Sequence, residues 1–178
     1  MNLSRVGPDG REAVIDLYGP GEIFGESVFV GAASGEHAVA VERTTVMSWS
    51  ASEISRIAHE NASTSFALWL LVVRRSVQFS ERVAESAVAP INNRVATALC
   101  HFVDKFGARR ADDSIEMPTI THDLLARYVG TSREVVTHVL NRFRRVGCIE
   151  YSRKGVTVLD SSFQEQLVYK RGRRRVRS

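Results

Sequence analysis

The sequence has few cysteines and no long run of apolar residues. Its two cysteines, Cys100 and Cys148, lie far apart, and neither belongs to a C-x-x-C pair. This excludes a disulfide framework, a zinc site and a four-cysteine iron–sulfur cluster, so we expect two buried, reduced thiols. The longest apolar run, Phe66 to Val73, is far too short to span a bilayer, and no signal peptide opens the chain. We therefore expect a cytoplasmic protein with no membrane partner.

Residue patterns that are typical of catalytic or metal sites are absent as well. The five histidines are scattered, and no nucleophile–base or metal-ligand spacing is present. Asp112 and Asp113 are adjacent acids in a polar segment and have no histidine partner. We therefore expect neither an enzyme nor a metal site.

The residues that are present suit a folded protein with a polyanionic partner. Of the 178 residues, 44% are hydrophobic, which is enough for real cores and excludes disorder throughout. The net charge of +4 is unevenly distributed, because residues 1–80 carry a net −3 and residues 81–178 a net +7. A mildly acidic first half and a basic second half predict that a polyanion contacts the second half.

The segment from Thr121 to Leu159 carries the strongest pattern. Two short apolar stripes at helical spacing are separated by a break at Gly130. The members of the stripes are Leu124, Leu125 and Val129, then Val135, Val136, Val139, Leu140 and Phe143. Two short helices joined by a tight turn that contains glycine form a helix-turn-helix. Ser132 or Thr131 can cap the second helix, and Thr131 with Glu134 has the spacing of a capping box.

The polar residues of this segment suggest how it would contact DNA. Polar side chains lie off the apolar stripe near the start of the second helix, where a recognition helix meets base edges. The expected base-reading residues are Arg133, Glu134, Thr137 and His138. Residues 149–151, a turn at 152–155 and residues 156–159 read as a hairpin, the wing of a winged helix. Helix N-termini and basic wing residues can bind DNA phosphates. We therefore expect phosphate contacts from Thr121, Ser132, Arg153 and Lys154. The alternative is an ordinary helical hairpin with a solvated charged face.

The first fifty residues read as strands and turns. The expected strands are Leu3–Val6, Ala13–Leu17, His37–Glu42 and Thr45–Trp49. Four strands are too few to close a barrel or to cover both faces of a sheet. This segment therefore looks like part of an all-β domain.

Helical periodicity begins near Ser52. We expect a short helix over Ser52–Asn61, a long one from Ser63 to about Ala89, and a third over Ile91–Phe106 that Gly107 ends. The long helix has apolar residues at alternating steps of four and three, which is the seam of a two-stranded coiled coil. The expected interface residues are Phe66, Leu70, Val73 and Val77. This pattern predicts a homodimer, and the alternative is a core helix within one subunit.

Taken together, the chain resembles the Crp/Fnr family of bacterial transcription regulators over essentially its whole length. The resemblance rests on Gly19–Glu26, Asn93–Ala96 and Leu125–Val136, of which the last is the most specific. It implies an α+β fold in which a cyclic-nucleotide-binding-type β-roll precedes a dimerisation helix and a C-terminal winged helix. Family members begin with further residues that supply the first strands, so we expect a partial β-roll here. The expected parts are a β-roll at 1–60, a dimerisation helix at 61–89, a winged helix-turn-helix at 90–165 and a basic tail at 166–178.

The resemblance also implies partners and a possible effector pocket. The partners would be double-stranded DNA, a second copy of the chain and RNA polymerase. The expected pocket residues are Glu26, Glu36, His37, Phe79 and Ser80. Cyclic-AMP-binding members have an Arg-Ser or Arg-Thr pair where this chain has Glu36 and His37, and a carboxylate there would repel a phosphate. We therefore expect no cyclic AMP or other cofactor, and the effector is unidentified. The competing function is a ligand-sensing or protein-interaction module whose winged helix docks protein instead of DNA.

Overall fold

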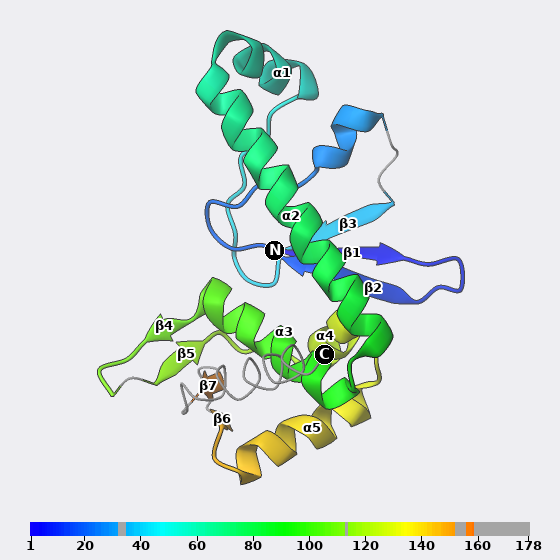
Figure 1. The fold of residues 1–178 in the computed structure, drawn as a ribbon, viewed down its shortest axis with the longest axis vertical. Helices are drawn as coiled ribbons and strands as arrows, with labels where there is room; N and C mark the ends of the chain where they lie inside the picture. The colour runs from blue at the N-terminus through cyan, green and yellow to red at the C-terminus, as the bar shows by residue number, and fades with distance from the viewer. Residues whose placement is uncertain (32–34, 113, 152–155, 159–178) are drawn as a thin grey trace, which may run out of the picture. The chain divides into compact units, whose positions relative to one another are not determined.

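The computed structural model describes residues 1–31, 35–112, 114–151 and 156–158 (Figure 1). The chain forms two compact units. The first contains Met1–Arg11 and Ile15–Val88, and the second contains Glu12–Val14 and Ala89–Ser178. Both combine helices with antiparallel strands, so the predicted α+β class is confirmed.

A small sheet opens the chain. Strands β1 (Asn2–Val6), β2 (Glu12–Leu17) and β3 (Glu36–Val39) lie in the order β2-β1-β3 (Figure 1). Strands β1 and β3 pair antiparallel, with Ser4 opposite His37 and Arg5 opposite Glu36. The first two predicted strands are confirmed, and the third is shorter than predicted. The chain then passes through a 3-10 helix, η1 (Glu26–Val30), that the sequence pattern did not suggest.

The strand that the sequence predicts at Thr45–Trp49 is wrong. These residues form neither helix nor strand, and Val46, Met47 and Trp49 are more than half exposed. Alternating apolar residues become a strand only where a neighbouring strand supplies hydrogen bonds. Within the described residues, the sheet of this unit contains only β1, β2 and β3, so the segment has no ladder to join.

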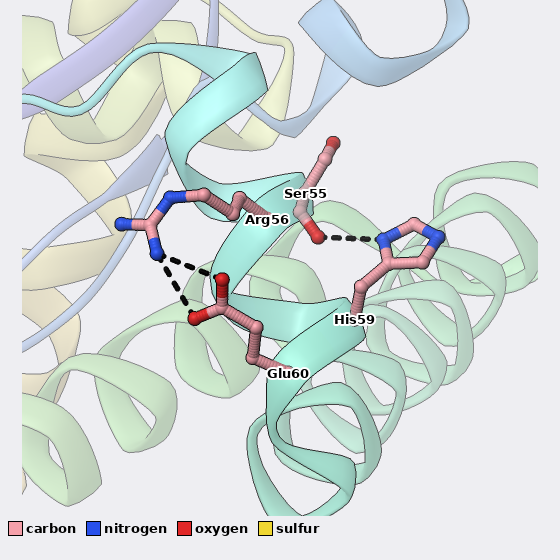
Figure 2. Close-up of polar contacts among 4 residues, drawn as sticks. All are labelled: Ser55, Arg56, His59 and Glu60. Carbon is pink, nitrogen blue, oxygen red and sulfur yellow. Dashed lines mark hydrogen bonds and ion pairs between the residues drawn. The ribbon is translucent and has the colours of Figure 1, made fainter.

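Two helices complete the first unit. Helix α1 (Ala51–Glu60) begins at Ser50, whose side chain accepts from the Glu53 amide while the Glu53 carboxylate accepts from the Ser50 amide. This reciprocal pair is a capping box. Figure 2 shows two further contacts along α1, which are the ion pair between Arg56 and Glu60 and the bond between His59 Nδ1 and the Ser55 carbonyl. Helix α1 packs against α2 (Ala62–Val88), and both match the predicted helices closely.

Helix α2 has 27 residues, and none of them is buried in the single chain. Phe66 is 59% exposed and Val77 54% exposed, Val73 is also exposed, and Leu70 is half-buried. A core helix within one subunit would bury its apolar stripe, and α2 does not. The four residues of the predicted seam therefore form a largely uncovered apolar face.

The second unit has its own core. Helix α3 (Ile91–Phe106) begins after Pro90 and ends at Gly107, as the sequence predicts. Its buried face includes Val95, Leu99 and Phe102, and the Phe102 ring lies 4.7 Å from that of Tyr128. The other elements are β4 (Ala108–Arg109), β5 (Ile115–Met117), α4 (His122–Val129), α5 (Arg133–Arg145), β6 (Ile149–Tyr151) and β7 (Val156–Val158).

The four strands of this unit form one sheet in the order β4-β5-β7-β6. The two paired strands of the hairpin predicted after α5 are confirmed, since Ile149 lies opposite Val158 and Glu150 opposite Thr157. The predicted turn at 152–155 and residue 159 fall outside the described residues. The sequence from Arg109 to Ser114 is polar and reads as a loop, and this prediction is only partly correct. Its first residue, Arg109, belongs to β4 and pairs with Ile115 of β5. Strands this short are stabilised by the neighbouring β7, so the local sequence pattern does not reveal them.

Candidate nucleic-acid interface

Helices α4 and α5 form the predicted helix-turn-helix. The Thr121 hydroxyl accepts from the Leu124 amide at 3.1 Å and so caps the start of α4. Gly130 ends α4 with a left-handed backbone, at φ 69°, which glycine adopts without strain. Helix α5 then begins at Ser132, whose hydroxyl accepts from the Val135 amide. Since Ser132 is the cap, the predicted capping box between Thr131 and Glu134 is wrong.

Arg94 of α3 supports the turn between these helices. Its guanidinium donates to the carbonyl of Val129, in the last turn of α4. A cation at the C-terminal end of a helix satisfies a carbonyl that has no partner within the helix and opposes the helix dipole. This contact holds the end of α4 against α3. The turn at Gly130 then leads from the end of α4 to α5.

Helix α5 divides into a buried face and an exposed face. Val136, Val139 and Leu140 are buried, which anchors the helix to the core. The opposite face carries a shallow hollow. Its lining residues are Arg133, Glu134, Thr137, His138 and Asn141. The four predicted base-reading residues are therefore brought together. Asn141 was missed, although it continues the i, i+4 row that begins at Arg133 and Thr137.

Thr137 also forms contacts within the protein. Its hydroxyl donates to the Arg133 carbonyl at 2.8 Å and lies 2.8 Å from Nδ1 of His122, on α4. This bridge joins the starts of the two helices. Burial and the charge of Arg133 lower the pKa of His122. No local sequence pattern indicates this contact, because it joins side chains from two separate helices.

The start of α5 favours negative charge. Hydrogen bonds from its own backbone amide and from the Ser132 hydroxyl lower the pKa of Glu134. Arg133, Glu134 and His138 are all exposed. The hollow therefore presents a cation, a carboxylate and an imidazole side by side, which is a mixed set of donors and acceptors.

The Ser132 cap leads to a first prediction. Ser132→Ala should lower the free energy of unfolding of the second unit by about 1 kcal/mol, because the Val135 amide loses its acceptor. Chemical denaturation measures this change. Ser132→Asp, which keeps an acceptor and places an anion at the helix start, should restore most of the stability. If the two variants are equally destabilised, the capping hydroxyl is not what stabilises α5.

The remaining predicted contacts lie in different places. Thr121 and Ser132 are at the starts of α4 and α5, as expected. Arg153 and Lys154, which lie in the predicted wing turn, and the basic tail at 166–178 fall outside the described residues. The interface residues Phe66, Leu70, Val73 and Val77 lie along α2.

The residues of the predicted effector pocket lie on three elements of the first unit. Glu26, at the start of η1, pairs with Arg75 of α2 at 2.6 Å, and Arg75 also donates to the Ile23 carbonyl. The Arg75 guanidinium lies over the Tyr18 ring, 4.9 Å from its centroid. Glu36 and His37 are on β3, whereas Phe79 and Ser80 are exposed on α2. The carboxylate of Glu26 is thus already neutralised within the chain.

Cys100 and Cys148 form no disulfide, but both are half-buried, where buried thiols were expected. Burial, followed by the charge of Asp104, raises the pKa of Cys100 to about 11, which keeps the thiol protonated. Across residues 1–31, 35–112, 114–151 and 156–158, no cluster of histidine, cysteine and acidic residues is placed to hold a metal. None of the helices in these segments is long and apolar enough to cross a membrane.

Comparison with known proteins places both units in known families. Residues 93–163 match the model of the Crp-like helix-turn-helix domain, and residues 1–61 match that of the cyclic nucleotide-binding domain. The chain is 27% identical over 170 residues to the CRP-like cAMP-activated global transcriptional regulator of Mycobacterium tuberculosis, covering 90% of this chain and 72% of that protein. It is 25% identical over 171 residues to the nitrogen fixation regulation protein FixK of Bradyrhizobium diazoefficiens, covering 94% and 70%.

Solved structures agree at the level of the fold. A CRP-family transcriptional regulator from Thermus thermophilus superposes with a TM-score of 0.70 at 24% identity, over 94% of this chain and 83% of that one. FixK2 from Bradyrhizobium japonicum gives a TM-score of 0.69 at 19% identity, over 94% and 81%. With a cyclic-nucleotide-binding-type unit followed by a Crp-like helix-turn-helix, and with named regulators among its relatives, the chain belongs to the Crp/Fnr family of transcription regulators.

Proposed function

We propose that this regulator acts as a homodimer that binds DNA at an inverted repeat, with α5 in the major groove. The observation that carries the proposal is the exposed face of α5, where five polar side chains line one hollow beside a capped helix start. A recognition helix reads base edges with such side chains near its N-terminus. The opposite face is buried, so the helix is held rigidly enough to position them.

The side chains in the hollow suit particular bases. The planar fork of Arg133 fits the O6 and N7 acceptors of one guanine. The carboxylate of Glu134 can accept from a cytosine N4 and can also orient Arg133. The amide of Asn141 could pair with an adenine, whereas His138 offers fewer donors and should read its base less stringently. We assign Thr137 a supporting part, since its hydroxyl already bonds to Arg133 and His122.

Phosphate contacts would position this helix on the duplex. The exposed starts of α4 at Thr121 and α5 at Ser132 present amides and the positive ends of helix dipoles. We propose that Arg153 and Lys154 of the wing add two more contacts, and that the tail at 166–178 adds affinity for DNA of any sequence.

The exposed seam of α2 supports the dimer. Apolar residues that stay uncovered at coiled-coil spacing fit a second copy of the same helix, because a two-fold interface pairs a surface with itself. In this assignment residues 1–60 form the sensor part, 61–89 the dimerisation helix, 90–165 the DNA-binding part and 166–178 a basic tail. RNA polymerase would be the protein that the bound dimer contacts, in the cytoplasm.

We propose that cyclic AMP is not the effector. Some relatives are named as activated by cyclic AMP, but here Glu36 stands where a phosphate-binding arginine is expected, and Glu26 already pairs with Arg75. The carboxylate of Glu36 would repel the cyclic phosphate. Adding cyclic AMP should therefore leave duplex affinity and thermal stability unchanged. A rise in either that saturates with nucleotide concentration would overturn this assignment.

Selection of bound duplexes from a random pool tests the function as a whole. The recovered sequences should share an inverted repeat, and affinity for that repeat should fall steeply as salt rises, because each phosphate contact releases counterions. Recovery of no common sequence, with weak binding that salt does not alter, would favour the competing function in which the winged helix docks protein.

A further inference from the structure

His122 joins the two helices of the proposed interface. It is the first residue of α4, and its Nδ1 lies 2.8 Å from the Thr137 hydroxyl of α5, which itself donates to the Arg133 carbonyl. A hydroxyl has one hydrogen, and Thr137 gives it to that carbonyl, so Nδ1 must be the donor in the bond between His122 and Thr137. The network therefore assigns the hydrogen of the neutral imidazole to Nδ1 and makes Nε2 the atom that titrates.

The charges around His122 disfavour a second proton in the free protein. The side chain is half-buried, and burial together with the charge of Arg133 lowers its pKa. Glu134 and His138 share the hollow with Arg133 and Thr137. On α4 itself, Asp123 is the nearest carboxylate in sequence. It pairs at 2.8 Å with Arg127, which also pairs with Glu12. The free protein therefore holds a neutral imidazole at neutral pH.

We propose that His122 is a proton-linked positioning residue, which takes up a proton at Nε2 when DNA binds while its Nδ1 keeps Thr137 and the first turn of α5 in place. The inference rests on the proposed DNA contact. The start of α4 at Thr121, next to His122 in the chain, and the start of α5 at Ser132 would then face phosphates. A polyanion at this position reverses the local field and favours the imidazolium, whereas it leaves the bond from Nδ1 to Thr137 unchanged.

The direction of the pH dependence follows from linkage. The pKa of His122 is lower in the free protein than in the complex, so the affinity for DNA is highest at pH values below the pKa of the free protein. The affinity falls as pH rises from the pKa of the free protein to that of the complex, and it is constant at higher pH. Uptake of this proton should make binding about three- to tenfold tighter at about pH 5.5 than at about pH 8. The salt slope should also be steeper at the lower pH by about 0.9, for one additional phosphate contact.

Two variants separate His122 from the other histidine of the hollow. His122→Asn keeps a side-chain N–H near the position of Nδ1 but does not titrate. Its affinity for the selected repeat should match wild type within about twofold at pH 8, with no gain at low pH and one salt slope at both pH values. His138→Gln should keep the pH dependence. The measurement is fluorescence anisotropy of the full chain with a labelled duplex.

The ring resonances of His122 provide a second readout that needs no variant. In wild type their titration midpoint should rise when the duplex is added. Full pH dependence in His122→Asn, equal wild-type affinity at both pH values, or an unmoved midpoint would each overturn the role of His122. These outcomes leave the proposed function intact, because the duplex is still bound. An absence of duplex binding at every pH would instead overturn the proposed function and this inference with it.

Discussion

Val73→Glu should convert the protein from a dimer into a folded monomer. In the single chain Val73 is 38% exposed, so the new carboxylate can remain solvated and the first unit should fold. In a dimer that pairs α2 with its copy, the same substitution buries two unpaired carboxylates. The penalty is several kcal/mol for each ion, which exceeds what one apolar contact contributes. Specific duplex affinity should fall to that of a single half-site.

Sedimentation velocity of the folded variant measures this effect, and circular dichroism establishes that the variant is folded. Gln78→Glu is the matched control, because Gln78 is exposed on α2 and lies outside the predicted seam. It should remain dimeric. If Val73→Glu stays folded and still sediments as a dimer, the face formed by Phe66, Leu70, Val73 and Val77 is not the interface. If it unfolds before any change in stoichiometry, α2 is a core helix.

Arg133→Ala should remove discrimination at one base pair of each half-site. If Arg133 donates to both acceptors of a guanine, its loss costs about 1–3 kcal/mol on the preferred site and much less on sites with another base there. Arg133→Lys keeps the charge but not the fork, so it should retain affinity for DNA in general and still lose most of the discrimination. Quantitative binding to all four bases at that position measures both effects.

Arg142 offers a control on the same helix. It is exposed in the last turn of α5 and does not line the hollow. Arg142→Ala should leave base preference unchanged. If Arg133→Ala instead weakens binding to every duplex equally, Arg133 contacts phosphate and does not read a base.

Local chemistry predicts the helices of this chain well. The Ala89–Pro90 step separates α2 from α3, because the residue before proline avoids the helical conformation, and Gly107 and Gly130 end α3 and α4. Three residues of the predicted apolar stripe of α5 form its buried face, but Val135 is 37% exposed and Phe143 is only half-buried. These features depend on neighbours within one or two turns, so the sequence alone contains the information.

The remaining features depend on contacts between distant segments. Residues 45–49 have a strand-like pattern but no strand to pair with, and Arg109 belongs to a strand only because β5 lies beside it. Two contacts join separate helices, one between His122 and Thr137 and the other between Arg94 and Val129. The local sequence allows either Thr131 or Ser132 to cap α5, and the geometry of the turn makes Ser132 the cap.

The dependence of affinity on half-site spacing tests the proposed dimeric DNA binding most directly. A dimer with two recognition helices in successive major grooves should bind best when the half-site centres are about 34 Å, or 10–10.5 base pairs, apart. Inserting about five base pairs rotates one half-site to the opposite face of the duplex and should reduce affinity to that of a single half-site. Titration should give two chains per duplex on the preferred spacing. Equal affinity at every spacing, or one chain per full site, would contradict a two-fold dimer on an inverted repeat.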